Sequence, residues 1–249
     1  MSVSFQPQVD THVHSIASGH AYSTIEEIAR AAQAKGLRGV AITDHGPGLP
    51  GGPHFYHFMA LRFVPRFIGT VRVLRGVEAN ILNDGHLDLE DHVLERLDIV
   101  LAGFHEDCAY DGTSCADHTR TLLRAMEHPH VDIISHPGNP QFPIDYAAVV
   151  EQAVRTGTAL EINSSSFTIS RRNSAPNCLE IARLAARLGA PVAIGSDAHI
   201  SMGVGKFREA LRALEQCGVA VEQVVNRTLE STVAFLQRNG RVVPLTEED

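Results

Sequence analysis

Seven short apolar runs along the chain have the length and the residue types of buried β-strands. Longer segments with apolar side chains at helical spacing separate them, so strands and helices alternate along the sequence. The expected strands are residues 9–14, 39–43, 71–77, 97–102, 131–135, 159–162 and 192–196. This alternation predicts an α/β fold with a parallel sheet whose successive strands are connected by helices.

The expected helices carry end signals in several places. Ser23-Thr24-Ile25-Glu26 is typical of a capping box, and it predicts a helix to about Lys35 that Gly36 ends. Arg62 and Arg66 have helical spacing within residues 61–68 and are expected on the surface. The other expected helices are residues 90–97, 119–126, 145–155, 177–188, 206–216 and 228–238.

Two stretches depart from the alternation. Residues 46–57 are rich in glycine, proline and histidine, and we expect them to form a loop. Residues 80–89 contain Asn83-Asp84-Gly85 and are expected to form a β-hairpin turn. Neither stretch has the composition of a linker, and no low-complexity segment divides the chain. We therefore expect one domain that spans residues 1–249.

Nearly every expected strand ends in, or just before, a residue that can bind a metal ion. The C-terminal ends of parallel strands meet at one face of an α/β fold, so these side chains should converge. A doubly wound sheet concentrates its site at one switch point, whereas here almost all strands contribute. The pattern therefore favours a seven-stranded (β/α)7 TIM-like barrel with a metal site at the C-terminal face of the strands.

Composition narrows the class of protein further. The chain has 249 residues and 44% hydrophobic residues, which is enough for one barrel-sized core. Its net charge of −8 argues against binding of nucleic acid through the phosphate backbone, which needs a basic face. The four cysteines form no C-x-x-C pair, which is typical of free thiols in a reducing compartment.

Targeting signals are not recognised in the sequence. No apolar run approaches the roughly 18 residues that a membrane span requires. Residues 1–8 lack the basic segment and the apolar segment of a secretory signal. We therefore expect a cytoplasmic protein without a membrane partner, and the sequence leaves open whether copies associate into a homo-oligomer.

The strongest chemical signal is a pair of chelating motifs at the first and last strands. His12 and His14 are two residues apart on a strand, so both imidazoles project from the same face. Asp197 and His199 repeat this spacing at the last strand, which is next to the first in a closed barrel. Glu78 ends the third strand, and its two carboxylate oxygens allow it to bridge two cations.

Several further side chains are candidates for the same face. The favoured metal ligands are His12, His14, His20, His45, Glu78, His105, His136, Asp197 and His199. Nine donors exceed the four that one zinc ion takes, so two or three divalent ions are needed. By itself His20 would be read as a surface histidine, and Asp44 is read as a residue that orients a ligand.

Other residues are candidates for substrate contact. Arg171 and Arg172 follow a run of serines after the sixth strand and could clamp a phosphate, although an exposed loop pair is the alternative. His54 and His57 lie in the glycine- and proline-rich loop and could touch substrate. The remaining histidines are expected in solvent, namely His86, His92, His118, His128 and His130.

These motifs together resemble the PHP (polymerase and histidinol phosphatase) family. Its H-x-H motif corresponds to residues 12–14 and its T-D-H-G motif to residues 43–46. Its S-H-P corresponds to residues 135–137 and its final G-S-D-A-H to residues 195–199. The likeness covers roughly residues 9–235 and is closest to the YcdX-type phosphatase branch.

The resemblance implies a distorted seven-stranded barrel that holds three divalent ions, usually zinc, with manganese or iron as alternatives. The first ion would take His12, His14, Glu78 and Asp197. The second would take Glu78, His105 and His136, and the third His20, His45 and His199. Glu78 would then bridge the first two ions, which agrees with the role expected from its chemistry.

The leading hypothesis for the activity is hydrolysis of a phosphomonoester on a small phosphorylated substrate. A hydroxide that bridges two ions would attack phosphorus, and Glu78, Asp197 and His199 would be the catalytic residues. The sequence does not choose between a histidine, Asp197 and a metal-bound water as the acid that protonates the leaving alkoxide.

Three alternatives use the same cluster. A phosphodiesterase or nuclease is disfavoured by the acidic net charge. An amidohydrolase-type barrel often bridges its metals with a lysine at a strand end, whereas Lys35 and Lys206, the only lysines, fall in helical regions. A metal-binding protein without turnover would have the same sequence signature.

Overall fold

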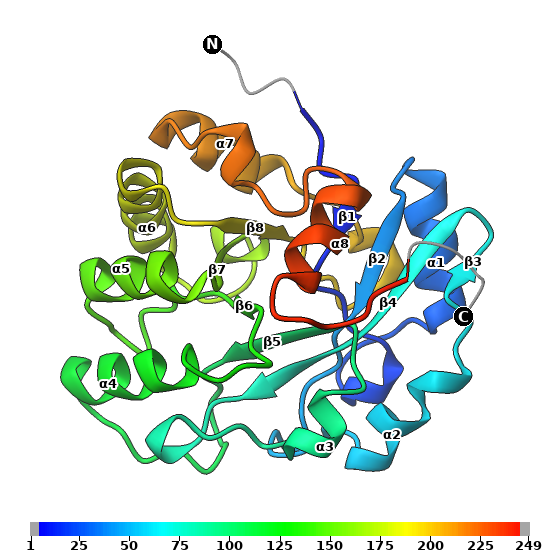
Figure 1. Cartoon of the computed structure of the whole chain (residues 1–249), viewed down its shortest axis with the longest axis horizontal. Helices are drawn as coiled ribbons and strands as arrows, with labels where there is room; N and C mark the ends of the chain where they lie inside the picture. Colours follow the sequence, from blue (N-terminus) through cyan, green and yellow to red (C-terminus); the bar gives the residue numbers. More distant parts are fainter. Residues whose placement is uncertain (1–4, 245–249) are drawn as a thin grey trace.

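The computed structural model describes residues 5–244, and their strands form one sheet with the order β1-β2-β4-β5-β6-β7-β8 (Figure 1). All neighbours in this order are parallel, and the short β3 pairs antiparallel with β4 outside it. The strands are β1 Val9–Asp10, β2 Gly39–Ile42, β3 Phe67–Ile68, β4 Val71–Asn80, β5 Ile99–Gly103, β6 Ile133–Ile134, β7 Ala159–Asn163 and β8 Val192–Gly195. All seven strands expected from the sequence are present, and β3 is additional.

The two ends of the sheet meet just beyond β1 and β8. The backbone amide of His14 donates to the carbonyl of Ala198 at 2.9 Å, and the amide of Asp197 donates to the carbonyl of His12 at 2.9 Å. The sheet is therefore a nearly closed barrel, which confirms the predicted architecture. Closure brings the first and last strand ends side by side, and with them the two chelating motifs.

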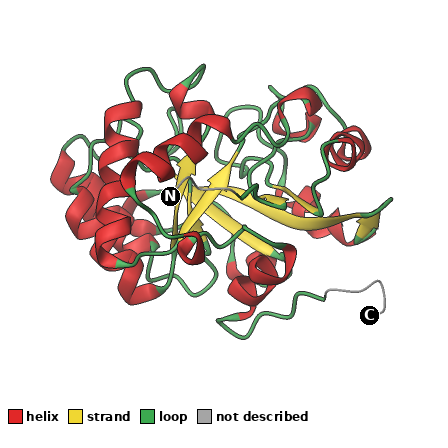
Figure 2. Cartoon of the chain, turned by 90° about the horizontal axis from the view of Figure 1, so that it is seen from above, coloured by secondary structure: helices red, strands yellow, loops and turns green. Residues whose placement is uncertain are grey.

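Helices cover the outside of this barrel on both sides (Figures 1 and 2). They are α1 Ile25–Ala34, α2 Phe55–Ala60, α3 Asp91–Leu94, α4 Cys115–Ala125, α5 Tyr146–Thr156, α6 Ala175–Leu188, α7 Arg208–Cys217 and α8 Leu229–Gln237. Helices α4, α5 and α6 lie next to one another along one side (Figure 1). Among the residues described, no helix is long and apolar enough to cross a membrane.

Local signals explain where several helices begin, and they correct three expectations. The capping box of α1 consists of Thr24 and Glu27, one residue later than expected. The loop expected at residues 46–57 contains the start of α2, whose first turn His54 caps through its side chain. The helical spacing at residues 61–68 yields only a short 3₁₀ turn, because Pro65 disfavours helical geometry before it.

The turn expected at residues 80–89 is present. Ile81 pairs with Leu87 in an antiparallel bridge, and the amide of Leu82 donates to the carbonyl of His86 at 2.8 Å. A 3₁₀ turn, Asn83–Gly85, connects them, with Asp84 at a φ of 60°. This turn packs against α4, which begins at Cys115, four residues earlier than expected, because Ser114 caps it.

Apolar side chains and α8 close the N-terminal end of the barrel. Leu74, Ile99 and Leu101 from the strands are completely buried in one cluster with Leu229 and Val233. Each such leucine or isoleucine contributes about 1.5–3 kcal/mol to stability through its burial. Apolar side chains thus fill the N-terminal end of the barrel, and the polar side chains lie at the C-terminal end.

A buried amide joins the first and last strands near this cluster. Asn226 donates to the carbonyls of Val9 at 2.7 Å and Ile194 at 2.8 Å, and it accepts from the amide of Ile194 at 3.0 Å. These hydrogen bonds satisfy backbone groups that a ladder between β1 and β8 would otherwise have to pair.

Candidate metal centre

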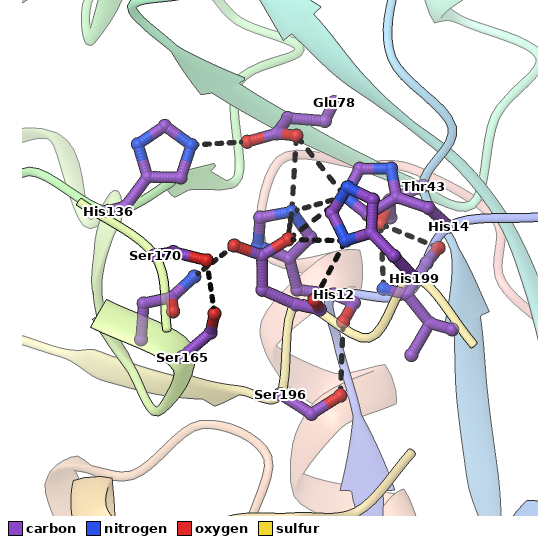
Figure 3. A network of polar contacts seen from close by, with 12 residues as sticks. His12, His14, Thr43, Glu78, His136, Ser165, Ser170, Ser196 and His199 are labelled. Carbon is purple, nitrogen blue, oxygen red and sulfur yellow. Dashed lines mark hydrogen bonds and ion pairs between the residues drawn. The ribbon is translucent and has the colours of Figure 1, made fainter. Parts of the chain in front are cut away.

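The nine predicted ligands converge at the C-terminal ends of the strands. Figure 3 shows five of them, His12, His14, Glu78, His136 and His199. His12 and His14 follow β1, His45 follows β2, and Glu78 lies within β4. The others come from the segments after β1, β5, β6 and β8, namely His20, His105, His136, Asp197 and His199. The imidazole rings of His20 and His199 have centroids 4.9 Å apart, so even the exposed loop histidine reaches the cluster.

Glu78 occupies the middle of the cluster and is completely buried. One carboxylate oxygen, Oε2, lies 3.2 Å from His12 Nε2 and 3.0 Å from His45 Nδ1. The other, Oε1, lies 2.7 Å from His136 Nε2 and 3.3 Å from His105 Nε2. Oε2 also lies 3.5 Å from His14 Nε2, so the two oxygens face different histidines, as expected of a carboxylate that bridges two cations.

Asp197 holds a corresponding position on the other side of the cluster. Its Oδ1 lies 3.3 Å from His14 Nε2 and 3.5 Å from His199 Nδ1. Its Oδ2 accepts a hydrogen bond from Arg171 Nη1 at 2.8 Å. One Asp197 oxygen thus faces the histidine cluster, and the other binds the half-buried guanidinium of Arg171.

The facing nitrogens of His12 and His14 are the clearest sign of a cation site. His12 Nδ1 lies 2.8 Å from a Glu161 oxygen, and His14 Nδ1 lies 3.2 Å from Ser18 Oγ, which donates to Asp44. Both Nδ1 atoms are therefore assigned as donors, which leaves the Nε2 lone pairs free in neutral rings. The two Nε2 atoms are only 3.0 Å apart, an arrangement that suits a shared cation.

Other buried donor atoms in the cluster are without hydrogen bonds. These atoms are His45 Nδ1, His105 Nε2, Glu78 Oε2 and Asp197 Oδ1. Buried polar atoms without partners are costly in a folded protein, and at functional sites they commonly bind an ion. Three groups of residues have potential metal-ligand atoms within 4.8 Å of one another. The groups overlap, and they are His14 with His45 and His199, His12 with His14 and Glu78, and His45 with Glu78 and His105. Imidazole nitrogens with carboxylate oxygens fit zinc and similar divalent ions.

The pKa values of most side chains in the cluster are shifted toward the protonation states that bind a cation. Burial and the neighbouring His45 lower the pKa of His14 to about 3, and burial and Arg171 lower that of His136 to about 4. Both imidazoles are therefore neutral near pH 7 and keep a lone pair. Burial acts to raise the pKa values of Glu78 and Asp197, but the surrounding histidines and Arg171 hold both well below their usual range.

His12 shows the opposite shift. Burial acts to lower its pKa, but the charges of Glu161, Glu78 and Asp197 outweigh burial and raise the pKa well above the ordinary value. Three carboxylates around one imidazole create a demand for positive charge, which a proton meets when no metal ion is bound. A bound metal ion would displace this proton.

Glu161 and Asp44 hold the histidines in place from behind. Glu161 is a buried residue of β7 that contacts His12 and accepts the backbone amide of His136 at 2.8 Å. Asp44 accepts from the Ser15 amide at 2.7 Å and from Ser18 Oγ at 2.7 Å. Partners of this kind fix the ring orientation and the tautomer of metal-binding histidines.

The sequence predicted the role of one of these two supporting residues but not of the other. Asp44 was expected to orient a ligand, and its contacts fit that role. Glu161 was not singled out, although a carboxylate within an apolar strand is a signal that could have revealed it. Burial acts to raise the pKa of Asp44, but hydrogen bonds from His57 and Ser18 prevail and lower it to about 2.

Strained backbone accompanies the cluster. His136 has a φ of 35° and Asp197 a φ of 55°, values that non-glycine residues rarely adopt. A Cβ atom on Gly195 would lie 2.0 Å from a Glu161 oxygen and 2.7 Å from His12 Cβ. Unfavourable backbone geometry and tight packing at Gly195 therefore accompany the orientation of the ligands, which is common at functional sites.

The cluster opens to the surface through a cleft of about 390 Å³. Arg171 lines this cleft. Arg172 is exposed and is not among the lining residues. His57 Nε2 lies 3.1 Å from Asp44 Oδ2, so it contacts the support of the cluster, whereas His54 is exposed at the start of α2.

The prediction for one histidine outside the cluster was wrong. His118 was expected in solvent, but it is buried, with Nδ1 at 2.9 Å from the carbonyl of Pro143 and Nε2 at 3.2 Å from that of Gly112. It therefore connects two segments beside the cleft. Helical spacing alone did not reveal this position, because both carbonyls come from loops, one six residues and the other 25 residues away in the sequence.

A nearly closed α/β barrel with a cluster of histidines and carboxylates at its strand ends is typical of metal-dependent hydrolases. A family model of the PHP domain matches residues 10–165. The chain belongs to the PHP family, as its motifs predicted.

Relatives along the whole chain agree with this assignment. A probable phosphatase of Syntrophotalea carbinolica is 54% identical over 96% of this chain and 100% of its own length. A probable phosphatase of Caldanaerobacter subterraneus subsp. tengcongensis is 48% identical over 94% of this chain and 92% of its own. Together with the cluster, these relatives support a metal-dependent phosphatase.

Solved structures show the same fold at low sequence identity. Histidinol phosphate phosphatase from Lactococcus lactis, in complex with zinc, L-histidinol and phosphate, has a TM-score of 0.62 and 17% identity over 85% of this chain and 94% of its own. A chain in an archaeal ribonuclease P structure with mature tRNA has a TM-score of 0.55 and 16% identity, covering 96% of this chain and 99% of its own. At these identities the likeness concerns the fold alone.

Proposed function

We propose that this protein hydrolyses phosphomonoesters with the help of three divalent metal ions, most favourably zinc, with manganese or iron as alternatives. The observation that carries the proposal is the buried carboxylate of Glu78, whose two oxygens face five histidines. The probable phosphatases related to the chain over nearly its full length support the same reaction.

The ligands divide most simply into three sets. His12 and His14 would share one ion with Glu78 and Asp197, since their Nε2 atoms are 3.0 Å apart. His105 and His136 would share the second with Glu78. His20, His45 and His199 would hold the third. His14 also lies in a donor triad with His45 and His199, so the first and third sets are in close contact.

When bound, the metal ions would lower the pKa of water to give a hydroxide and would stabilise charge on the phosphoryl oxygens. Arg171 would orient the phosphoryl group, because its guanidinium lines the cleft while Asp197 fixes it from one side. Attack forms one phosphorus–oxygen bond and breaks the bond to the leaving oxygen. That oxygen departs as an alkoxide and needs a proton, for which the half-buried His199 beside Asp197 is the candidate.

Three features would keep these groups in position during the reaction. Glu161 would hold His12 in the tautomer that presents Nε2, and Asp44 would do the same for His14 through Ser18. The strained backbone at His136 and Asp197 would fix the direction of both side chains. Preorganisation of this kind reduces the reorganisation required in the transition state.

The test compares substrates on the metal-loaded protein. Samples that were stripped with a chelator and reloaded with Zn²⁺, Mn²⁺ or Fe²⁺ are assayed with phenyl phosphate and with single-stranded DNA. We expect release of phosphate from phenyl phosphate and no cleavage of the DNA. Cleavage of DNA without monoester hydrolysis would favour the phosphodiesterase alternative, and metal binding without either reaction would favour a metal-binding protein.

A further inference from the structure

A second hollow lies beside the metal cleft. It has a volume of about 1020 Å³, and Ser170, Asp197 and His199 line both hollows. Its walls come from the segment after β7, the segment after β8 and the start of α7. We call this hollow the side groove. Figure 3 shows Ser165, Ser170 and Ser196, which line the groove, close to the histidine cluster.

The side groove has an apolar part that faces solvent. Ile169 is 91% exposed, Met202 is 67% exposed and Ile200 is 40% exposed, and all three line the groove. Ile169 belongs to the segment after β7, whereas Ile200 and Met202 belong to the segment after β8. Large apolar side chains that are exposed together beside an active centre are typical of a ligand-binding surface.

The side groove also has a basic end. Lys206 and Arg208 line it at the start of α7, and both are exposed. Among the described residues that line this end, Glu209 is the acidic one, and it is shared, since it lies 2.7 Å from Arg208 and 3.2 Å from Arg212. The metal cleft differs in charge, because Glu106 and Asp107 lie on its wall. A second anionic group on a substrate would therefore be favoured in the side groove and opposed in the cleft.

We propose that the side groove binds the alcohol part of the substrate, and that this part has an apolar body and an anionic group at its far end. The inference rests on the proposed phosphatase function. His199 and Asp197 form the wall between the two hollows, so a leaving oxygen near His199 directs the rest of the alcohol toward the groove. The apolar body then packs on Met202 and Ile169, and the anion reaches Lys206 and Arg208.

Three aryl phosphates with leaving phenols of similar acidity test this proposal. They are phenyl phosphate, biphenyl-4-yl phosphate and 4′-carboxybiphenyl-4-yl phosphate, and they add first the apolar body and then the anion. We expect kcat/KM to rise along the series, by about tenfold or more for the second ring. Lys206→Ala combined with Arg208→Ala should remove most of the gain from the carboxylate, a few-fold to about tenfold.

The variants separate the two parts of the groove. Ile169→Ser combined with Met202→Ser should lower kcat/KM for both biphenyl substrates by a larger factor than for phenyl phosphate, whose alcohol part lacks the second ring. Equal turnover of all three substrates by the wild type, or equal losses on all three in the variants, would overturn the proposed groove.

A binding measurement keeps this test separate from the proposed activity. Hydrolysis of phenyl phosphate reports on the activity alone. If the wild type hydrolyses none of the three esters, binding of 4′-hydroxybiphenyl-4-carboxylate is measured by calorimetry. Weaker binding to the Lys206 and Arg208 double variant than to the wild type would support the groove, and equal or absent binding would refute it.

Discussion

The two ends of the barrel use burial in opposite ways. At the N-terminal end, residues such as Leu74 and Ile99 pack against α8 in a fully apolar cluster. At the C-terminal end, Glu78, His12 and Asp197 are equally buried but are surrounded by other polar groups. One end therefore stabilises the fold, whereas the other concentrates buried charges that a bound cation would help to balance, together with strained backbone.

This contrast predicts that changes at the two ends should have different consequences. Substitutions at the apolar end should weaken the fold and leave the chemistry intact. Substitutions at the polar end should remove metal and activity with little loss of fold. The predictions below test this division, in order of decreasing effect.

The largest effect is expected from Glu78→Gln. The amide cannot supply two anionic oxygens to two cations, so we expect loss of metal and a fall in kcat of about 10³-fold or more. Elemental analysis and turnover of phenyl phosphate measure the two losses, and circular dichroism checks the fold. Glu90→Gln, at a side chain that is 85% exposed, is the matched control and should change neither. Full metal content and turnover in the Glu78 variant would refute its role.

At the other end, Leu74→Ala should destabilise the fold by about 2–5 kcal/mol, because it leaves a cavity among completely buried side chains. Urea unfolding of the metal-free protein measures the change. Metal content and kcat of the folded fraction should remain at wild-type values. A variant with normal stability but reduced metal content would show that the two ends are not separate in function.

The sequence predicted the barrel and the cluster because both depend on local patterns. Each strand is a short apolar run, and each of these ligands lies near the C-terminal end of its strand, so the parallel arrangement alone brings His12, Glu78 and His136 together. The predicted ligand set needed no knowledge of loop conformation. His20 is the exception, and only the family resemblance singled it out.

The features that the sequence did not reveal depend on contacts between distant segments. Glu161 orients His12 across 149 positions of sequence, and no local pattern indicates that pairing. Adjacent residues can also have different surroundings. Arg171, with a φ of 49°, lines the cleft, whereas Arg172 is exposed and does not line it. The side groove combines three segments, and its walls could be recognised only after the barrel had closed.

That divergence of the two arginines gives the third prediction. Arg171→Ala should lower kcat/KM for phenyl phosphate by about 10- to 100-fold, because one charge-assisted contact to the phosphoryl group is lost. Arg172→Ala should leave kcat/KM unchanged. Steady-state kinetics on both variants decide the matter. Equal effects of the two substitutions would show that Arg171 does not act on the phosphate.

Behind the ligands, Glu161→Gln should weaken metal binding by about 10- to 100-fold, because His12 loses the partner that fixes its ring. Equilibrium dialysis against Zn²⁺ measures the affinity. Glu151→Gln, on the exposed face of α5, serves as the control. Unchanged affinity in the Glu161 variant would mean that the cluster orients His12 without it.

The smallest expected effect concerns protons. The pKa of His12 is raised, so its contribution to the stability of the metal-free fold is present below the ordinary histidine pKa and is lost as pH rises through the folded value. At pH 7 metal binding should therefore displace about one proton from His12. Calorimetry in buffers of different ionisation enthalpy measures the release, which should be smaller in Glu161→Gln. Identical release in both proteins would contradict the raised pKa.

The most direct test of the central claim is the metal content of the purified chain after stripping and dialysis against Zn²⁺, Mn²⁺ or Fe²⁺. The nine donors at the strand ends predict about three ions per chain for the wild type, and fewer than two in Glu78→Gln. A folded wild-type chain that binds no ions, or a Glu78 variant that retains all of them, would contradict the account.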